Sequence, residues 1–432
     1  MPRASLRKVT GALLALLVVV TSITPPVRAL LTMPEHVNIA SDTKYQLGPR
    51  LPLLSLRCRS SSLVSVSSQE SFWILPNQDG IGEVEVMLLG ALPLKKVRVS
   101  VIPRLRLIPG GHSIGVLLRS DGVIVTGVSG VVGQSGETTY PARDAGIRQG
   151  DLILAVDGQA VRSEAHIASL VNDAGRSGRP IQITAKRMDG SVYVSNVVPR
   201  YCVETRRYRI GLWVRDGAAG VGTLTFVDPR SMRFGALGHV VTDTDTGRPV
   251  EVGDGEIVKA QVTAIEEGRS GKPGEKIGLF LQDKEVLGSI DANSRFGISG
   301  TLYSILHNPL YPDPIEIALG SEVHPGPAEI VTVIQGQQIE KFAVEIIKVN
   351  LSPSVEGRNL VLRVTDPRLI KKTGGIVQGM SGSPIIQDGK LVGAVTHVFI
   401  SDPTKGYGVL IENMVLDCGL VEPGWTGLTF FV

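Results

Sequence analysis

The sequence predicts a mainly β protein built from several domains. Its 432 residues include 50 glycines and 26 prolines, and only 5% of the residues are aromatic. Short runs rich in Val, Ile and Leu lie between these glycines and prolines, which favours strands joined by tight turns over long helices. A chain of this length divides into domains of about 100–200 residues each. We therefore expect two or three separate β-rich cores.

Charge and cysteine content exclude several functions. The net charge is only +3 and the basic residues are not clustered, which argues against nucleic-acid binding. Cys58, Cys202 and Cys418 are far apart and form no Cys-x-x-Cys pair, so they predict buried thiols and neither a zinc site nor a disulfide framework. The sequence also lacks His-Glu-x-x-His. We expect no metal and no cofactor.

The first 29 residues predict an export signal. Arg3, Arg7 and Lys8 precede an apolar run at 11–23, and Val-Arg-Ala at 27–29 follows two prolines. The apolar run is short for a membrane-spanning helix, which needs about 20 residues. We expect a signal peptide cut after Ala29, with a permanent N-terminal anchor as the alternative. In either case the following domains leave the cytoplasm.

Residues 30–103 predict a small β-rich module without catalytic residues. Apolar and polar residues alternate at 82–86 and 97–101, as in strands with one buried face. Serine-rich stretches at 59–62 and 65–68 predict a flexible segment that is open to proteolysis. We therefore expect the protein to cut itself between the signal and the next domain.

Residues 104–200 carry three segments that resemble a PDZ domain. They are Ser-Ile-Gly-Val-Leu-Leu at 113–118, Gly-Val-Ile-Val-Thr at 122–126 and Ala-Gly-Ile-Arg-Gln-Gly-Asp-Leu-Ile-Leu-Ala-Val-Asp-Gly at 145–158. A polar helix at 163–174 and a strand at 181–186 are expected to follow. The resemblance implies that a peptide adds as a strand to the edge after Gly115, and that its terminal carboxylate or an internal loop binds there. It places the binding loop at Ser113, Ile114, Gly115 and Val116.

The strongest chemical signal is Gly-Met-Ser-Gly-Ser-Pro at 379–384, followed by two short strands around an Asp-Gly turn. It resembles the nucleophile loop of trypsin-like peptidases, with Ser381 as the nucleophile. Glycines let the backbone turn sharply, so that the N–H groups of Gly379 and Ser381 can converge on an oxyanion. Ser383 is the less favoured alternative, since it occupies the variable position of the motif.

A serine nucleophile requires a general base, and His239 is the best candidate. It ends the glycine-flanked apolar segment 234–239, far enough before Ser381 for the two residues to lie on different β-barrels. The third member should be a buried carboxylate that orients the imidazole. Asp366 follows a predicted strand at 360–365, although Asp-Pro also begins turns. The competing carboxylates are Asp243, Asp283 and Asp291.

Taken in order, these motifs resemble the SpoIVB (stage IV sporulation protein B) serine peptidases over nearly the whole chain after the signal. The segments that carry the resemblance include 92–97, 108–111, 113–116, 235–239 and 379–384. It implies a trypsin-like double β-barrel at 201–432 and the triad His239, Asp366 and Ser381.

The resemblance also implies a signalling protease of sporulation, exported into the space between the forespore and mother-cell membranes. Its expected protein substrates are itself and a membrane-bound regulator, whose cleavage releases an intramembrane metalloprotease. Two alternatives remain open. One is an HtrA-like quality-control protease, in which the PDZ domain follows the peptidase. The other is a non-catalytic PDZ scaffold.

Overall fold

The computed structural model describes residues 25–59, 61–280, 285–351 and 357–421. The chain forms two compact units, and strands predominate in both, which confirms the predicted mainly β class. One unit extends to Leu105 and includes Ile317–Val323, and the other comprises Arg106–Glu316 and His324–Leu420. Most of the predicted signal segment lies outside the described residues. Within those residues, none of the helices has both the length and the apolar character needed to cross a membrane.

The first unit consists of two small sheets around one core. One sheet has the strand order β1-β7-β6-β3 and the other β2-β5-β4, and a shared cluster of buried residues joins them. Its elements are α2 (Pro25–Thr32), β1 (His36–Ala40), β2 (Tyr45–Pro49), β3 (Leu54–Cys58), β4 (Val64–Ser67), β5 (Ser71–Pro76), β6 (Gly80–Leu88), β7 (Leu92–Ile102) and η1 (Gly320–Glu322).

The second of the two serine-rich stretches, at 65–68, lies mostly in a strand and is not the flexible segment that the sequence predicted. Residues 65–67 belong to β4, which pairs antiparallel with β5. Serine side chains bury little apolar surface. Val64 and Val66 alternate with the serines and pack in the core, so the valines stabilise the strand. Self-cleavage within this stretch would require local opening of the sheet.

The PDZ region is the part of the second unit built on the C-terminal half of β9 (Ser113–Val128). Its main strands follow the order β15-β14-β12-β9, and α4 packs over a separate cluster of buried apolar residues. Further elements of this region are β10 (Val131–Val132), β11 (Thr138–Thr139), α3 (Pro141–Asp144), β12 (Leu152–Val156), β13 (Gln159–Ala160), α4 (Glu164–Arg176), β14 (Ile181–Lys186), β15 (Val192–Val197), β16 (Arg200–Cys202) and β17 (Arg207–Arg209).

The polar helix and the following strand of this region were predicted correctly. Ser163 is the N-cap of α4, where its Oγ accepts a hydrogen bond from the backbone N–H of His166 at 3.1 Å. Ile167 and Val171 lie four residues apart on the buried face of the helix. β14 covers the predicted strand, and alternate residues of it are buried.

A first barrel follows in the second unit. β9, β20, β22, β23, β19 and β18 pair in that order, and pairing of β9 with β18 closes the ring. The elements of this barrel and its borders are β8 (Arg106–Pro109), β18 (Leu212–Val227), β19 (Arg233–Ala236), β20 (Val252–Glu266), β21 (Glu275–Phe280), β22 (Val286–Ser294), β23 (Gly297–Leu302) and β24 (Ile315–Glu316).

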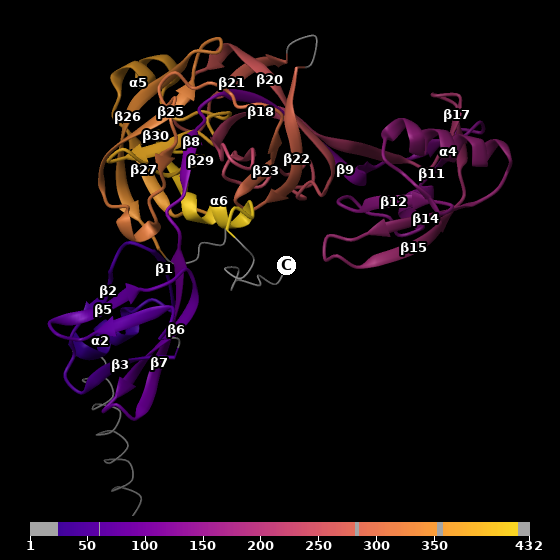
Figure 1. Ribbon diagram of the computed structural model, residues 1–432. Helices are drawn as coiled ribbons and strands as arrows, with labels where there is room; N and C mark the ends of the chain where they lie inside the picture. The colour runs from indigo at the N-terminus through magenta and orange to yellow at the C-terminus, as the bar shows by residue number, and fades with distance from the viewer. Residues whose placement is uncertain (1–24, 60, 281–284, 352–356, 422–432) are drawn as a thin grey trace, which may run out of the picture. The chain divides into compact units, whose positions relative to one another are not determined.

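A second barrel closes through the strand order β25-β26-β27-β30-β29-β28. In Figure 1 its strands run from orange to yellow, with α6 against β29 and β30. Its elements are β25 (Gly326–Val333), β26 (Ile339–Val349), β27 (Leu360–Val364), α5 (Pro367–Thr373), β28 (Pro384–Gln387), β29 (Lys390–Phe399), β30 (Asp402–Leu410) and α6 (Ile411–Asp417). The structure therefore contains the predicted pair of β-barrels.

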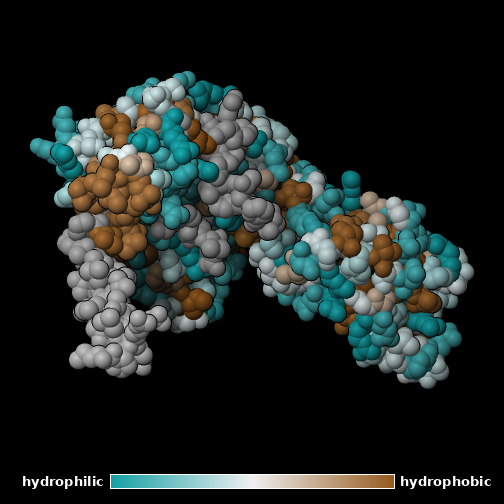
Figure 2. Space-filling model, turned by 90° about the horizontal axis from the view of Figure 1, so that it is seen from below, coloured by the Kyte–Doolittle hydropathy of each residue, from teal (hydrophilic) through white to brown (hydrophobic). Residues whose placement is uncertain are grey.

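The surface carries apolar side chains in separate patches. Figure 2 shows such patches among polar residues on the face that it draws. Two exposed apolar residues, Ile277 and Leu279, lie on β21, and Trp213, which is 66% exposed, lies at the start of β18. Large exposed aromatic side chains are frequent at binding sites for other chains.

Candidate active site and peptide groove

The nucleophile loop lies between α5 and β28 and is shaped by two glycines with positive φ. Gly379 has φ 87° and Gly382 has φ 91°, a backbone conformation that favours glycine. Ser381 between them is half-buried. Its Oγ donates a hydrogen bond to the carbonyl oxygen of Thr396 on β29 at 2.7 Å. The serine that the sequence singled out is thus held against a strand of the second barrel.

In the described chain, the backbone N–H groups of Gly379 and Ser381 are not used in hydrogen bonds. The carbonyl of Gln378 accepts from the backbone N–H of Lys276 at 2.9 Å, and the carbonyl of Met380 accepts from Ser383 Oγ at 2.6 Å. In a trans peptide, the N–H points away from the carbonyl of the same group. Within the described chain neither N–H donates to another residue. Two anchored peptide groups therefore leave both N–H groups available as donors, which an oxyanion hole requires.

His239 follows β19 after two residues in the left-handed conformation, Leu237 (φ 68°) and Gly238 (φ 72°). Its Nδ1 lies 2.9 Å from the carbonyl oxygen of Val240. A carbonyl can only accept, so Nδ1 carries the hydrogen and Nε2 is left as the proton acceptor. Burial lowers the pKa of His239, and the Val240 hydrogen bond opposes this effect. The ring is therefore neutral near pH 7, as a general base must be.

β29 brings the serine and the histidine together. Ser381 donates a hydrogen bond to Thr396, and the ring of His239 packs at a tilt of 39° against the next residue, His397, with 4.8 Å between the ring centroids. In the described structure Ser381 makes no hydrogen bond to His239, because its hydroxyl is turned to Thr396. Ser381 and His239 thus contact neighbouring residues of β29, Thr396 and His397. A rotation about χ1 of Ser381 would break its hydrogen bond to Thr396 and redirect its hydroxyl.

His397 belongs to this site and was not predicted from the sequence. Burial, the neighbouring His239 and Arg358 lower the pKa of His397 to about 4, so it stays neutral at physiological pH. Its buried Nδ1 has no hydrogen-bond partner in the described chain. The sequence signal was weak, since His397 follows an ordinary apolar strand and only the barrel closure brings it to His239.

Asp366 does not contact His239. It is the N-cap of α5, where its carboxylate accepts from the backbone N–H of Arg368 at 2.9 Å and pairs with the Arg368 side chain at 2.8 Å. The backbone N–H of Ala343 is a third donor, at 3.3 Å. The Arg368 hydrogen bond is the main reason that the pKa of Asp366 is lowered. The expected orienting contact to the imidazole is therefore absent, because helix capping occupies the carboxylate.

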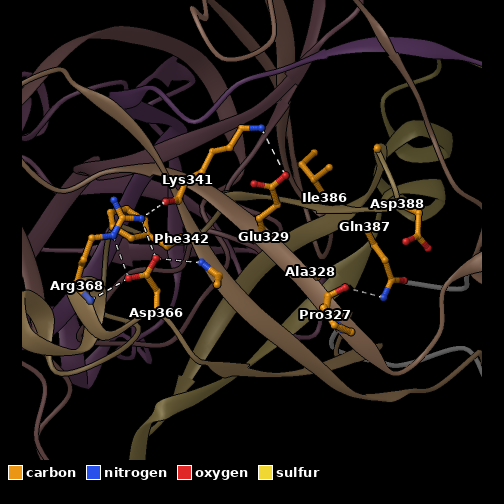
Figure 3. Close-up of a pocket in the computed structure, with 12 residues that line it drawn as sticks. Pro327, Ala328, Glu329, Lys341, Phe342, Asp366, Arg368, Ile386, Gln387 and Asp388 are labelled. Carbon is orange, nitrogen blue, oxygen red and sulfur yellow. Dashed lines mark hydrogen bonds and ion pairs between the residues drawn. The ribbon is translucent and has the colours of Figure 1, made fainter.

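Asp366 instead lines a separate cavity of about 450 Å³ on the second barrel. Figure 3 shows Asp366 and Arg368 on one side of this cavity, with Glu329 and Lys341 also among its lining residues. Neither Ser381 nor His239 is among the residues that line it. The Asp-Pro sequence is thus explained by the start of α5.

The competing carboxylates are also engaged elsewhere or lie outside the described chain. Asp243 accepts from Arg215 at 2.8 Å and from Thr246 at 2.8 Å. Asp291 pairs with Arg233 at 3.1 Å. Asp283 lies outside the described residues. Within the described chain, the Val240 carbonyl is thus the hydrogen-bond partner of the His239 Nδ1.

The predicted peptide-binding loop was placed in the wrong part of the fold. Ser113, Ile114, Gly115 and Val116 form the start of β9 inside the first barrel, where β18 pairs with one edge and β20 with the other at 114–116. A strand with both edges occupied cannot accept a peptide strand. The glycine serves packing instead, since a methyl group at Gly115 would lie 2.6 Å from the Phe280 ring.

The PDZ region has its own groove, between α4 and the start of β18. Residues 212–214 pair with β9 on one edge, and among the described strands no partner covers the other. The groove is lined by Glu164, Ile167, Ala168, Val171, Arg207, Tyr208, Arg209, Ile210, Gly211, Leu212, Trp213 and Val214. Gly211 precedes the strand with φ 78°. An open strand edge facing a helix can take up an extended peptide.

The paired barrels and a serine loop with two free N–H groups define a trypsin-like serine peptidase. Residues 206–415 match the family model described as SpoIVB peptidase S55, and residues 135–181 match the PDZ domain model. The protein is therefore a serine peptidase of the SpoIVB family S55 that carries a PDZ domain.

Solved structures add a distant likeness. The active form of the Rv3671c protease from M. tuberculosis has 15% sequence identity and a TM-score of 0.27, and the match covers 47% of this chain and 74% of that chain. The inactive form of Rv3671c protease has 12% identity and a TM-score of 0.26, with 46% and 84% covered. A search of curated protein sequences found no match. The family assignment rests on the family models.

Proposed function

We propose that this protein is an exported signalling endopeptidase of sporulation, with Ser381 as nucleophile and His239 as general base. The observation that carries the catalytic assignment is the meeting of Ser381, two free N–H donors and a neutral imidazole around β29. Export is supported by the sequence of residues 1–29, and the role in sporulation by the family match. By the same resemblance, its place of action is the space between the forespore and mother-cell membranes.

The geometry supports acyl transfer in two steps. Ser381 Oγ leaves Thr396, gives its proton to Nε2 of His239 and forms a bond to the scissile carbonyl carbon. The N–H groups of Gly379 and Ser381 bind the resulting oxyanion. The imidazolium then protonates the leaving amine as the C–N bond breaks. Water repeats the sequence on the acyl-enzyme, which releases the acid and restores Ser381. The Val240 carbonyl keeps the required tautomer throughout.

The third member of the predicted triad can be tested with Asp366→Asn. Asn caps helices as well as Asp does, and the Arg368 side chain is 63% exposed, so we expect the free energy of unfolding to change by less than about 1 kcal/mol. From its contacts we expect kcat to fall less than tenfold. A loss of about 10⁴ in a folded variant, measured with a short peptide substrate, would instead show that Asp366 reaches His239 during turnover.

The proposed substrates are the protein itself and a membrane-bound regulator of an intramembrane metalloprotease. Mass spectrometry of the purified protein tests the first. We expect N-terminal fragments in wild type that are absent from Ser381→Ala, with cut sites outside the paired strands of the first unit. Identical fragments in both proteins would mean that a foreign protease made the cuts.

The open edge of β18 is the proposed binding site for a peptide segment of the substrate. In this position the main chain of the peptide would pair with residues 212–214, while its side chains contact α4 and Trp213. Strand pairing of this kind selects an extended segment, and the apolar groove residues Ile167, Val171 and Leu212 favour apolar side chains in it. The groove would select substrates, whereas Ser381 carries out the chemical step.

Ala168→Phe tests this groove, because Ala168 is exposed on α4 and lines it. The substrate is the full-length Ser381→Ala protein supplied in trans. We expect its cleavage to slow about tenfold, equivalent to about 1.4 kcal/mol of lost binding free energy, while hydrolysis of a short peptide changes less than twofold. Ala165→Phe is the matched control, since Ala165 is exposed on the same helix outside the groove. Equal losses on both substrates would contradict a role limited to binding.

A further inference from the structure

Lys276 is a buried lysine without an ion-pair partner, located next to the nucleophile loop. It lies on β21, where alternation buries Lys276 to 2% exposure while its neighbours Glu275 and Ile277 are exposed. Within the described chain no carboxylate pairs with it. Burial of an unpaired ammonium group is unfavourable, so a lysine at such a position calls for an explanation.

The side chain of Lys276 reaches the nucleophile loop through a threonine. Nζ lies 2.8 Å from Thr332 Oγ1 on β25 and 3.3 Å from Thr223 Oγ1 on β18. Thr223 Oγ1 in turn donates to the carbonyl of Gly379 at 2.8 Å. A protonated amine can only donate, so it leaves the single hydroxyl hydrogen of Thr223 directed at Gly379.

The backbone of Lys276 holds the other side of the same glycine. Its N–H donates to the carbonyl of Gln378 at 2.9 Å, in the peptide group that carries the N–H of Gly379. The aliphatic part of Lys276 also fills the space beside the glycine, since a methyl group at Gly379 would lie 3.0 Å from Lys276 Cβ. Both carbonyls that flank Gly379 are thus anchored, one by the Lys276 main chain and one through its amine.

We propose that Lys276 is a positioning residue that holds the peptide groups around Gly379 in the orientation of an oxyanion hole. This rests on the proposed roles of Gly379 and Ser381. Gly379 is flexible and has positive φ, so its flanking peptide groups could rotate if they were not anchored. Such a rotation would turn the Gly379 N–H away from the oxyanion.

The same contacts make the anchoring of Gly379 by Lys276 sensitive to pH. The groups that face the amine are Thr223 from β18, Thr332 from β25 and Gly379 from the nucleophile loop, and none of them ionises. Burial alone lowers the pKa of Lys276 to about 7. Once neutral, the amine can accept the Thr223 hydrogen, which releases the Gly379 carbonyl. We therefore expect kcat to fall as pH rises through this pKa.

Lys276→Met tests the proposal, since Met fills a similar volume without a donor. We expect kcat for a short peptide to fall about 10²-fold, in the range found for loss of one oxyanion donor, with KM within threefold. The fall of kcat at alkaline pH should disappear. Lys272→Met, which removes an exposed lysine near the same strand, should leave the pH profile and kcat unchanged.

Thr223→Val and Thr223→Ser keep the test decisive if Lys276→Met does not fold. Val removes the hydroxyl at nearly constant shape, whereas Ser retains it, so Thr223→Val should lose kcat about 10²-fold and Thr223→Ser should remain near wild type. The proposal would be overturned if Lys276→Met or Thr223→Val folds and keeps the wild-type kcat with the same fall of kcat at alkaline pH. If the wild-type protein shows no peptidase activity that depends on Ser381, the proposed function is refuted instead.

Discussion

Ser381→Ala and His239→Ala are each expected to lower kcat by several orders of magnitude. The serine supplies the attacking oxygen and His239 supplies an Nε2 that can accept its proton, so either loss removes the same covalent step. The double variant should be little slower than either single variant, because residues that act as a unit are not additive. Hydrolysis of a short peptide and labelling of Ser381 by a fluorophosphonate would measure both effects.

His397→Asn is the control for this experiment. His397 contacts the ring of His239 but makes no hydrogen bond to Ser381. We expect a loss well below that of His239→Ala. If His397→Asn abolished labelling of Ser381 while His239→Ala left it intact, the general base would be His397 and not His239.

The pH dependence of wild type gives a second check on the base. Burial lowers the pKa of His239 below its ordinary value of 6.5, so the neutral, active form persists to lower pH. On the acid side, activity should therefore be lost only as pH falls through this lowered pKa. On the alkaline side, activity should fall as Lys276 loses its proton, with a pKa of about 7. An acid limb above pH 6.5 would contradict a buried neutral base.

The parts of the site that the sequence predicted are those encoded by short segments. The loop around Ser381 needs glycines at fixed neighbouring positions, where the backbone takes positive φ values, so a short motif is enough to identify it. His239 was found for the same reason, since it ends a short glycine-flanked strand. The pair of barrels followed from the family resemblance and from the frequent glycine-punctuated strands.

The missed features depend on contacts between segments that are distant in sequence. Lys276 looks like one exposed position of an alternating strand, and it is buried by contacts with β18, β25 and the nucleophile loop about a hundred residues later. The glycine pattern at 113–116 fits a ligand loop as well as a barrel strand, and pairing with β18 and β20 decides between them. For Asp366, the local Asp-Pro signal for a helix start proved stronger than the expected contact with a distant histidine.

The two barrels meet at Gly382, and Gly382→Ala is expected to be among the most destabilising single changes. A methyl group there would lie 2.0 Å from the carbonyl oxygen of Thr223 and 2.4 Å from the backbone nitrogen of Leu237, which are main-chain atoms of the first barrel. Its φ of 91° is also strained for alanine. We expect a loss of at least about 3 kcal/mol in the free energy of unfolding.

Gly389→Ala is the matched control for that loss. Gly389 also has a positive φ, 75°, but a methyl group there would meet nothing within 4 Å. Gly389→Ala should therefore lower the free energy of unfolding by only about 1 kcal/mol, the cost of the left-handed backbone conformation for alanine. Both variants are best compared by urea unfolding in the Ser381→Ala background, where self-cleavage cannot shorten the chain. Equal losses would show that the close approach of the nucleophile loop to the first barrel contributes nothing, since both glycines would then be needed only for their backbone conformation.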